Sequence, residues 1–305
     1  MKKEENTPHK PDSISDVHKK IGLPPPVHPL ISLINNTTSK IDIEKLRRPH
    51  ILSFYKISYK TSFKGRVRYG QGYYDFDGGG LLFASPNQVI GGHDETTLDP
   101  GYTLIIHPDF LLSYPLAKKI KQHSFFSYSV NEALHLSDTE SATIASVFKF
   151  IEDELNSRID DFSQDVIIAQ LELLLNYANR FYKRQFLTRK AVNNELLQKL
   201  EDVLEAYFND DILLTKGVPT VQYLAEQLNF SPSYLSDMLR SQTGYNAQQH
   251  IHNLLIEKAK EKLSTTNLSV SEVAYALGFE YPQSFSKLFK AKTDLSPLEF
   301  RRAFN

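Results

Sequence analysis

Residues 269–302 read SVSEVAYALGFEYPQSFSKLFKAKTDLSPLEFRR, and their pattern indicates the structure of the C-terminal part of the chain. Ser269 and Glu272 have the spacing of a capping box, which satisfies the first backbone N–H groups of a helix. The apolar pattern ends in Leu277-Gly278-Phe279, and Pro282 then suits the first position of a second helix. The spacing predicts a short helix, a tight turn and a second helix.

The same pattern occurs once before in the chain. Ala225 recurs as Ala274, where the two helices of each copy must cross closely, and Ser231-Pro232 supply an N-cap and a first-turn proline. An amphipathic stretch from about 247 to 263 predicts a long helix between the copies. Two helix-turn-helix units, at about 220–241 and 269–292, and a stiff connector are typical of a protein that binds successive major grooves of DNA.

Outward side chains of the second helix in the later unit suit DNA bases. Gln283 can pair with adenine N6 and N7, and Lys287 can donate to guanine O6 and N7, with Ser284 presented beside them. Other basic residues suit phosphate, which positions a protein without specifying sequence. These candidates for phosphate contact are Arg240, Lys290, Lys292, Arg301 and Arg302. For each lysine the alternative is an ordinary solvated helix face.

Residues 194 to about 303 resemble the AraC/XylS-type family of transcriptional regulators. The resemblance is carried by Leu277-Gly278-Phe279, Phe285-Ser286, Phe289-Lys290, Ser296-Pro297 and Phe300-Arg301, which fall in the expected order and spacing. It implies a sequence-specific transcription factor that binds double-stranded DNA, often an activator that contacts RNA polymerase. It also implies base-facing positions for Gln283 and Lys287, and for Ser233, Ser236 and Asp237 in the first unit.

Three departures from the family pattern matter, and one of them is in the predicted connector, where Asn253 and Leu255 replace frequently basic residues and would reduce attraction to the DNA backbone. Asp237 stands where a basic or neutral polar side chain is frequent, and a carboxylate repels phosphate although it can accept from cytosine N4. Asp294 stands where glycine usually allows a left-handed turn, a conformation that Asp tolerates at modest cost. The first unit is therefore expected to discriminate less between sequences, or to bind differently.

Composition limits the remaining possibilities. A chain of 305 residues favours two domains. The absence of cysteine excludes disulfides, thiolate metal sites and cysteine nucleophiles. A net charge of −1 gives no global attraction to nucleic acid, so DNA binding must depend on where charges lie. No apolar run of about 18 residues is present, so we expect a cytoplasmic protein with no membrane contact.

The N-terminal half has a different pattern of apolar residues. Short alternating apolar runs with Gly, Pro and Asn between them predict antiparallel strands, and a capping box at Ser137 opens helices. We expect an α+β protein with a cupin-like β-barrel followed by helices, and an all-α C-terminal domain. The predicted bounds are a flexible tail at 1–28, a barrel at 29–136, helices at 137–186, a linker at 187–193 and a DNA-binding domain at 194–305.

The predicted barrel leaves several functions open. The weak resemblance to the family's sensing domain implies a small effector, commonly a sugar, and Tyr69, Tyr73 and Tyr74 are the candidates to bind it. An aromatic stripe that includes Tyr55 and Tyr59 could line such a pocket or belong to the core. The other possibilities are a homodimerisation module and an interaction module without ligand.

A metal-dependent cupin enzyme is the competing class. It needs several histidines and a carboxylate on barrel strands. His93, Glu95 and His107 lack the usual spacing, and His250 and His252 fall on the predicted connector helix, where positions two apart point to different sides. We therefore expect no enzyme, no metal and no cofactor.

Overall fold

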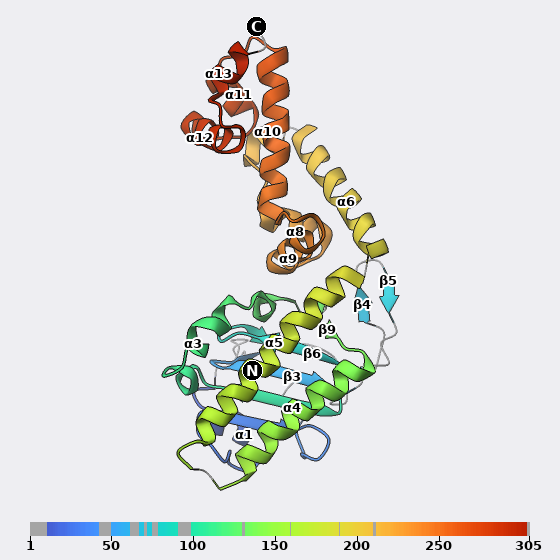
Figure 1. The fold of residues 1–305 in the computed structure, drawn as a ribbon, viewed down its shortest axis with the longest axis vertical. Coiled ribbons are helices and arrows are strands. Elements are labelled where there is room, and N and C mark those ends of the chain that lie inside the picture. The colour runs from blue at the N-terminus through green and yellow to red at the C-terminus, as the bar shows by residue number, and fades with distance from the viewer. Residues whose placement is uncertain are drawn as a thin grey trace, which may run out of the picture. The chain divides into compact units, whose positions relative to one another are not determined.

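The computed structural model describes residues 11–42, 50–61, 67–69, 72–74, 79–90, 99–129, 132–158, 160–188, 190–209 and 212–303. The chain divides into two compact units, Met1–Gln185 and Phe186–Asn305. Figure 1 shows strands in the first unit and helices in the second. The predicted α+β class is confirmed. None of the helices in the described ranges is long and apolar enough to cross a membrane.

The first unit is built on an antiparallel sheet of five strands in the order β1-β8-β3-β6-β9. These strands are β1 (Ile31–Asn35), β3 (Tyr55–Lys60), β6 (Gly80–Ala84), β8 (Gly101–Ile106) and β9 (Leu134–His135). Two smaller pairs join β2 (His50–Ile51) to β7 (Val89–Ile90) and β4 (Val67–Tyr69) to β5 (Gly72–Tyr74). The antiparallel strands agree with the sequence pattern, and closure into a cupin-like barrel stays a prediction.

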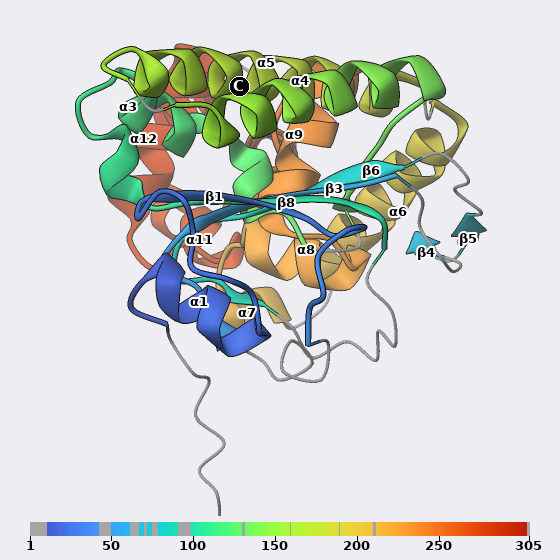
Figure 2. The ribbon, with the colours of Figure 1, turned by 90° about the horizontal axis from the view of Figure 1, so that it is seen from below.

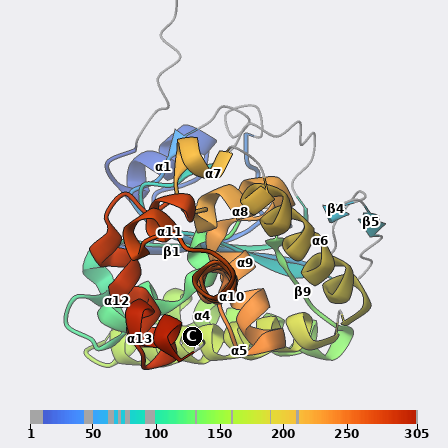
Figure 3. The same ribbon diagram turned by 90° about the horizontal axis from the view of Figure 1, so that it is seen from above.

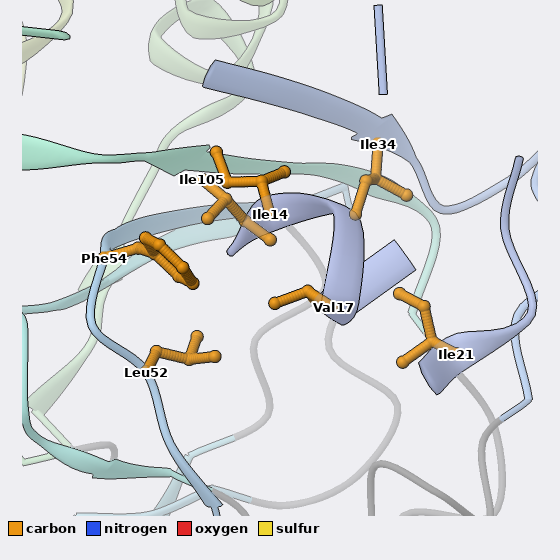
Figure 4. Packing of buried hydrophobic residues seen from close by; sticks show 7 residues of the cluster. All are labelled: Ile14, Val17, Ile21, Ile34, Leu52, Phe54 and Ile105. Carbon is orange, nitrogen blue, oxygen red and sulfur yellow. The ribbon is translucent and has the colours of Figure 1, made fainter. Parts of the chain in front are cut away.

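Helix α1 (Ile14–Ile21) covers one face of this sheet (Figure 2). Its apolar side chains pack into a cluster of buried residues, shown in Figure 4, that consists of Ile14, Val17, Ile21, Ile34, Leu52, Phe54 and Ile105. Ser13 accepts a hydrogen bond from the Asp16 N–H at 3.1 Å, and Gly22 ends the helix at φ 78°. The flexible tail predicted for 1–28 is therefore wrong from residue 11 onward, because one apolar stripe on a capped helix is enough to bury it.

The opposite face of the sheet is covered by α4 (Asp138–Asn156) and α5 (Ser163–Thr188), as Figure 2 shows. The predicted capping box at Ser137 and Glu140 starts α4, with both reciprocal hydrogen bonds present. Between β8 and β9 lie short helices: η1 (Pro108–Leu111), α3 (Leu116–Lys119), η2 (Ile120–Gln122) and η3 (Ser124–Ser127). The sheet thus lies between one short helix and two long ones.

Two tyrosines of the predicted aromatic stripe belong to this core. The ring of Tyr59 stacks on Phe148 of α4 with centroids 5.6 Å apart, and its hydroxyl lies 2.7 Å from the Ser141 hydroxyl. Tyr55 meets Phe126 edge-on at 5.2 Å. The core alternative therefore holds for these two residues, since their rings already have partners.

The effector candidates lie on the small β4–β5 pair. Tyr69 ends β4, Tyr73 and Tyr74 lie on β5, and Val67 is opposite Tyr74 in the ladder. Their side chains lie outside the described part of the structure. An effector site at these tyrosines stays a prediction.

The predicted linker at 187–193 is helical where the structure describes it. Helix α5 continues to Thr188, and α6 (Lys190–Asn209) begins at Lys190. The segment contains neither glycine nor proline, so nothing in it stops a helix. Composition alone suggested a boundary here, but the backbone has no signal for an irregular segment.

The second unit contains two helix pairs joined by one long helix. The pairs are α8 (Val221–Leu228) with α9 (Pro232–Thr243) and α11 (Val270–Ala276) with α12 (Pro282–Thr293). The long helix is α10 (Ala247–Thr265), and α7 (Ile212–Lys216) and α13 (Pro297–Arg302) flank the pairs. Figure 3 looks nearly along α10 and shows α11, α12 and α13 on one side of it. Helix α10 packs against α9, α11 and α13, and α6 packs against α8.

Candidate nucleic-acid interface

Helix α12 has one buried and one exposed face. Phe285 and Phe289 are 1% and 0% exposed, and Phe289 meets Phe300 of α13 edge-on at 5.4 Å. Pro282 starts the helix at its first position, as predicted. The opposite face carries exposed residues, and these are the predicted base contacts Gln283, Ser284 and Lys287.

Basic residues continue along the end of α12. Lys290 and Lys292 are exposed, and Lys292 Nζ donates to Asn253 Oδ1 of α10 at 3.3 Å. Asp294 ends the helix at φ 61°, with its N–H donating to the Lys290 carbonyl at 2.9 Å, so Asp takes the left-handed position as expected. Among the described residues, none forms a hydrogen bond or an ion pair with the Lys287 ammonium.

The two arginines of α13 differ from each other. Arg301 is half-buried, and its Nε donates to the Leu263 carbonyl in the last turn of α10 at 3.1 Å. Arg302 is exposed. Part of the Arg301 donor capacity is therefore used to join α13 to α10. This contact could not be predicted from the sequence, because nothing in the local pattern relates positions 263 and 301.

Helix α9 offers less exposed polar surface and less positive charge than α12. Ser231 caps it by accepting from the Tyr234 N–H at 3.3 Å, as predicted. The predicted base contacts Ser233, Ser236 and Asp237 are half-buried. Arg240 Nη1 lies 3.5 Å from Asp237 Oδ1, one turn back along the helix. The cation predicted to contact phosphate is thus paired with the carboxylate predicted to contact a base, so α9 has less positive charge to offer than α12.

Helix α10 fixes the spacing between the two pairs. Its 19 residues span about 28 Å at a rise of ~1.5 Å per residue. Ala225 and Ala274 are both fully buried at the crossing of the helices in each pair, as the repeat predicts. The two second helices are therefore held on one body at a separation set by a rigid element, which is the arrangement that binding in successive major grooves requires.

Two histidines of α10 have polar partners, one on α9 and one on α10 itself. His250 Nε2 lies 2.9 Å from Thr243 Oγ1, and burial lowers the pKa of His250. His252 Nε2 lies 2.8 Å from Gln248 Nε2. Burial, and then the positive charge of Lys292, lower the pKa of His252. Both imidazoles are therefore held toward the neutral form.

The histidine candidates of the competing metalloenzyme are not brought together where the structure describes them. His107 Nδ1 accepts from the Asp109 N–H at 3.1 Å and caps a short helix. His93 and Glu95 lie outside the described residues. Within the described ranges no group of three or more His, Asp or Glu could hold a metal ion.

Comparisons with known proteins identify the helical region. Residues 224–303 match the family model of a helix-turn-helix domain. The HTH-type transcriptional activator RhaS of Salmonella schwarzengrund is 29% identical over 149 residues, which cover 48% of this chain and 51% of that protein. An uncharacterized HTH-type transcriptional regulator of Staphylococcus aureus is 26% identical over 45% of this chain and 17% of its own length. The chain thus spans about half of the first relative and a smaller part of the second.

Solved structures also match the helical region. The C-terminal domain of the two-component response regulator yesN from Fusobacterium nucleatum is 30% identical, covers 34% of this chain and 95% of that chain, and has a TM-score of 0.31. The DNA-binding domain of AdpA, in complex with a target DNA, is 27% identical over 34% of this chain and 91% of that chain, with a TM-score of 0.30. Together with the family model and the two helix pairs around α10, the sequence relatives identify the C-terminal helices of this chain as a helix-turn-helix domain of the AraC type.

Proposed function

We propose that this chain is a sequence-specific DNA-binding transcription factor and not an enzyme, with residues 194–305 as its DNA-binding domain. The observation that carries the proposal is the solvent face of α12, where Gln283, Ser284 and Lys287 are exposed on a helix-turn-helix frame. Side chains of these types hydrogen-bond to base edges in the major groove. In this proposal the partner is double-stranded DNA.

The roles of the remaining side chains follow from their position. Lys290, Lys292 and Arg302 are exposed at or beyond the end of α12, where they would contact phosphate. Arg301 would contact phosphate only through the N–H groups that are not bonded to the Leu263 carbonyl. Such contacts fix the register of the helix in the groove, while Gln283 and Lys287 supply the discrimination between bases.

The first helix pair contributes differently in this proposal. Ser233, Ser236 and Asp237 would face the second major groove, and the Asp237 carboxylate would accept from a cytosine N4 amino group. Its pairing with Arg240 reduces the attraction of this helix to phosphate. We therefore assign most of the sequence specificity to α12 and most of the groove spacing to α10.

The N-terminal unit would modulate DNA binding in the cytoplasm. We propose that it does so through a small effector or through homodimerisation, and that the bound protein acts as an activator in contact with RNA polymerase. Tyr69, Tyr73 and Tyr74 remain the candidates for a sugar-like effector. The alternative is an interaction module without ligand, in which case DNA affinity would not change with any small molecule.

Selection of binding sites tests the proposal directly. The full-length protein is incubated with a random double-stranded DNA library, and bound sequences are enriched and compared. We expect two short conserved blocks whose centres lie about one helical turn apart, roughly 10 base pairs, because α10 fixes the distance between the groove-binding helices. Enrichment of no sequence over the starting library would overturn the proposal.

A further inference from the structure

On the outer edge of β1, some backbone groups have no hydrogen-bond partner among the described residues. Two hydrogen bonds flank its ladder with β8: Asn36 N–H donates to the Gly101 carbonyl and His107 N–H donates to the Leu30 carbonyl, both at 2.8 Å. Bonded pairs alternate along antiparallel strands. Residues 32 and 34 therefore bond to β8, and residues 31, 33 and 35 direct their backbone groups away from it.

These outward groups stay open in the described part of the chain. The Asn35 carbonyl accepts from the Ser39 N–H at 3.0 Å. No described residue is hydrogen-bonded to the N–H or the carbonyl of Ile31 or Leu33 on this side. An edge strand with open groups is a template for one more strand. Here the template is centred on Leu33.

A groove of about 220 Å³ runs along this edge. One wall is the segment from Leu23 to Val27, and the other is the C-terminal end of α4 at Leu155 and Asn156. His18 holds the first wall against β1: its Nδ1 lies 2.6 Å from the Pro24 carbonyl and its Nε2 lies 2.8 Å from Ser32 Oγ. A carbonyl only accepts, so Nδ1 carries the proton and donates. The imidazole of His18 thus bridges this wall to the strand.

One end of the groove carries a carboxylate. Glu152 lines it beside Asn35, whose Nδ2 lies 3.5 Å from Glu152 Oε1. The Tyr102 hydroxyl and the Lys149 ammonium donate to the other carboxylate oxygen at 3.3 and 3.1 Å. Neither lysine nor arginine is among the residues that line the groove. Lys149 also pairs with Asp153 at 2.9 Å, so two carboxylates share one ammonium and one negative charge is left over. A cationic group therefore suits this end, and the proline-rich wall suits apolar side chains.

We propose that this groove binds a short extended peptide, which adds to β1 as an antiparallel strand with its free amino end beside Glu152. Strand addition to a sheet edge takes affinity from backbone hydrogen bonds and specificity from alternate side chains. Antiparallel to β1, such a peptide starts next to Asn35 and ends next to Ile31. Its ammonium group then meets the carboxylate that lines that end.

The dimensions of the groove select this ligand over a second copy of the chain. A second β1 would bring its own two walls and would be held beyond the ~4.8 Å spacing of paired strands. A single extended peptide meets no such obstacle. The volume is also below the range of about 300 to 1,000 Å³ for pockets that hold drug-sized ligands, so the groove encloses only a short stretch of the peptide. This inference deepens the proposed function, since the peptide would be the effector of the N-terminal unit.

The test uses the full-length protein and trivaline amide with a free amino group as the probe. Titration calorimetry gives the affinity, and hydrogen exchange followed by mass spectrometry reports on residues 31–35. We expect saturable binding and slower exchange at Ile31 and Leu33. Acetylation removes the positive charge beside Glu152, and N-methylation of the middle valine removes a backbone donor to Leu33, so each should weaken binding about tenfold.

Substitutions in the protein test the same contacts as the changes to the probe. Leu33→Pro removes an N–H that β8 does not use, so an edge strand tolerates it, and it should abolish binding. Glu152→Gln should weaken the probe about tenfold but leave acetylated trivaline amide unchanged, whereas Glu154→Gln on the same helix should change neither. Equal binding of the N-methylated probe would overturn the inference. So would the absence of protection at β1, or protection that rises with protein concentration alone.

Binding to a selected DNA site, measured for every variant without peptide, separates the two proposals. If the unsubstituted protein binds the selected DNA site but shows neither peptide binding nor protection at β1, the peptide site alone is rejected. Peptide binding without any sequence-specific DNA binding supports the peptide site and rejects the proposed function.

Discussion

Gly278 lies directly against Gly217: a Cβ placed on Gly278 would be 2.8 Å from the Gly217 carbonyl carbon. Both glycines have positive φ, 79° and 75°. Gly278 forms the turn between α11 and α12, and Gly217 precedes the first helix pair, where its carbonyl accepts from the Tyr207 hydroxyl at 3.0 Å. The turn of the second pair thus packs against the residue that precedes the first pair. This contact helps to hold the two pairs together.

Gly278→Ala should therefore destabilise the DNA-binding domain by about 2 to 4 kcal/mol, because it adds a clash with backbone to the strain of a left-handed alanine. Gly244 is the matched control: its φ is 80°, but nothing lies within 4 Å of its added Cβ. Gly244→Ala should cost only about 1 kcal/mol. Chemical denaturation of the full-length protein measures both, and equal losses would show that the contact with Gly217 is not tight.

Lys287→Ala should weaken binding to a selected site by about 1 to 3 kcal/mol if its ammonium donates to guanine. Lys290→Ala should instead weaken binding to selected and random DNA alike and reduce the salt dependence by about one ion. Fluorescence anisotropy at several salt concentrations distinguishes the two. An equal loss on both DNAs for Lys287→Ala would make it a phosphate contact.

Asp237→Asn should raise the affinity for random DNA about two- to fivefold, because it removes a carboxylate near phosphate and releases Arg240 from its ion pair. The base preference at the position facing α9 should also relax. Asp202→Asn changes the net charge equally on α6, outside both helix pairs, and serves as the control. The same gain in both variants would assign the effect to net charge rather than to the Asp237–Arg240 pair.

Stability should decrease as the pH falls below about 6.5. The pKa of His250 and of His252 is lowered in the folded protein, so the unfolded chain takes up protons first and is favoured at acid pH. Above that pH both states hold neutral imidazoles and the effect vanishes. Removing the Lys292 charge with Lys292→Gln should reduce the loss of Tm between pH 7.5 and 5.5. A decline of the same size in His252→Gln would exclude His252 as its source.

Ile14→Ala should destabilise the first unit by about 2 to 4 kcal/mol, since Ile14 is fully buried against the sheet. Ser15→Ala, an exposed change on the same helix, should be close to neutral. Circular dichroism during denaturant unfolding compares them. If Ile14→Ala has a negligible effect on the free energy of unfolding, the prediction of a flexible tail for this segment would be supported instead.

The helical repeat shows how far local signals reach. The capping box at Ser269 and the proline at 282 were predictable, because each depends on residues within a few positions, whereas the left-handed Asp294 was implied by the family resemblance. The exposed trio on α12 followed from the same helical period. Local signals failed at α1, where three apolar residues in a proline-rich segment find their partners on strands far along the chain.

Periodicity and capping are properties of neighbouring residues, so they were enough to predict the two helix-turn-helix pairs, their connector and the side chains on the outer face of α12. The pairing of Asp237 with Arg240, the bond of Arg301 to Leu263, and the edge of β1 that no described residue covers beside Glu152 became visible only in the folded chain. Side-chain distances and the order of strands depend on how distant segments pack, and no local pattern contains that information.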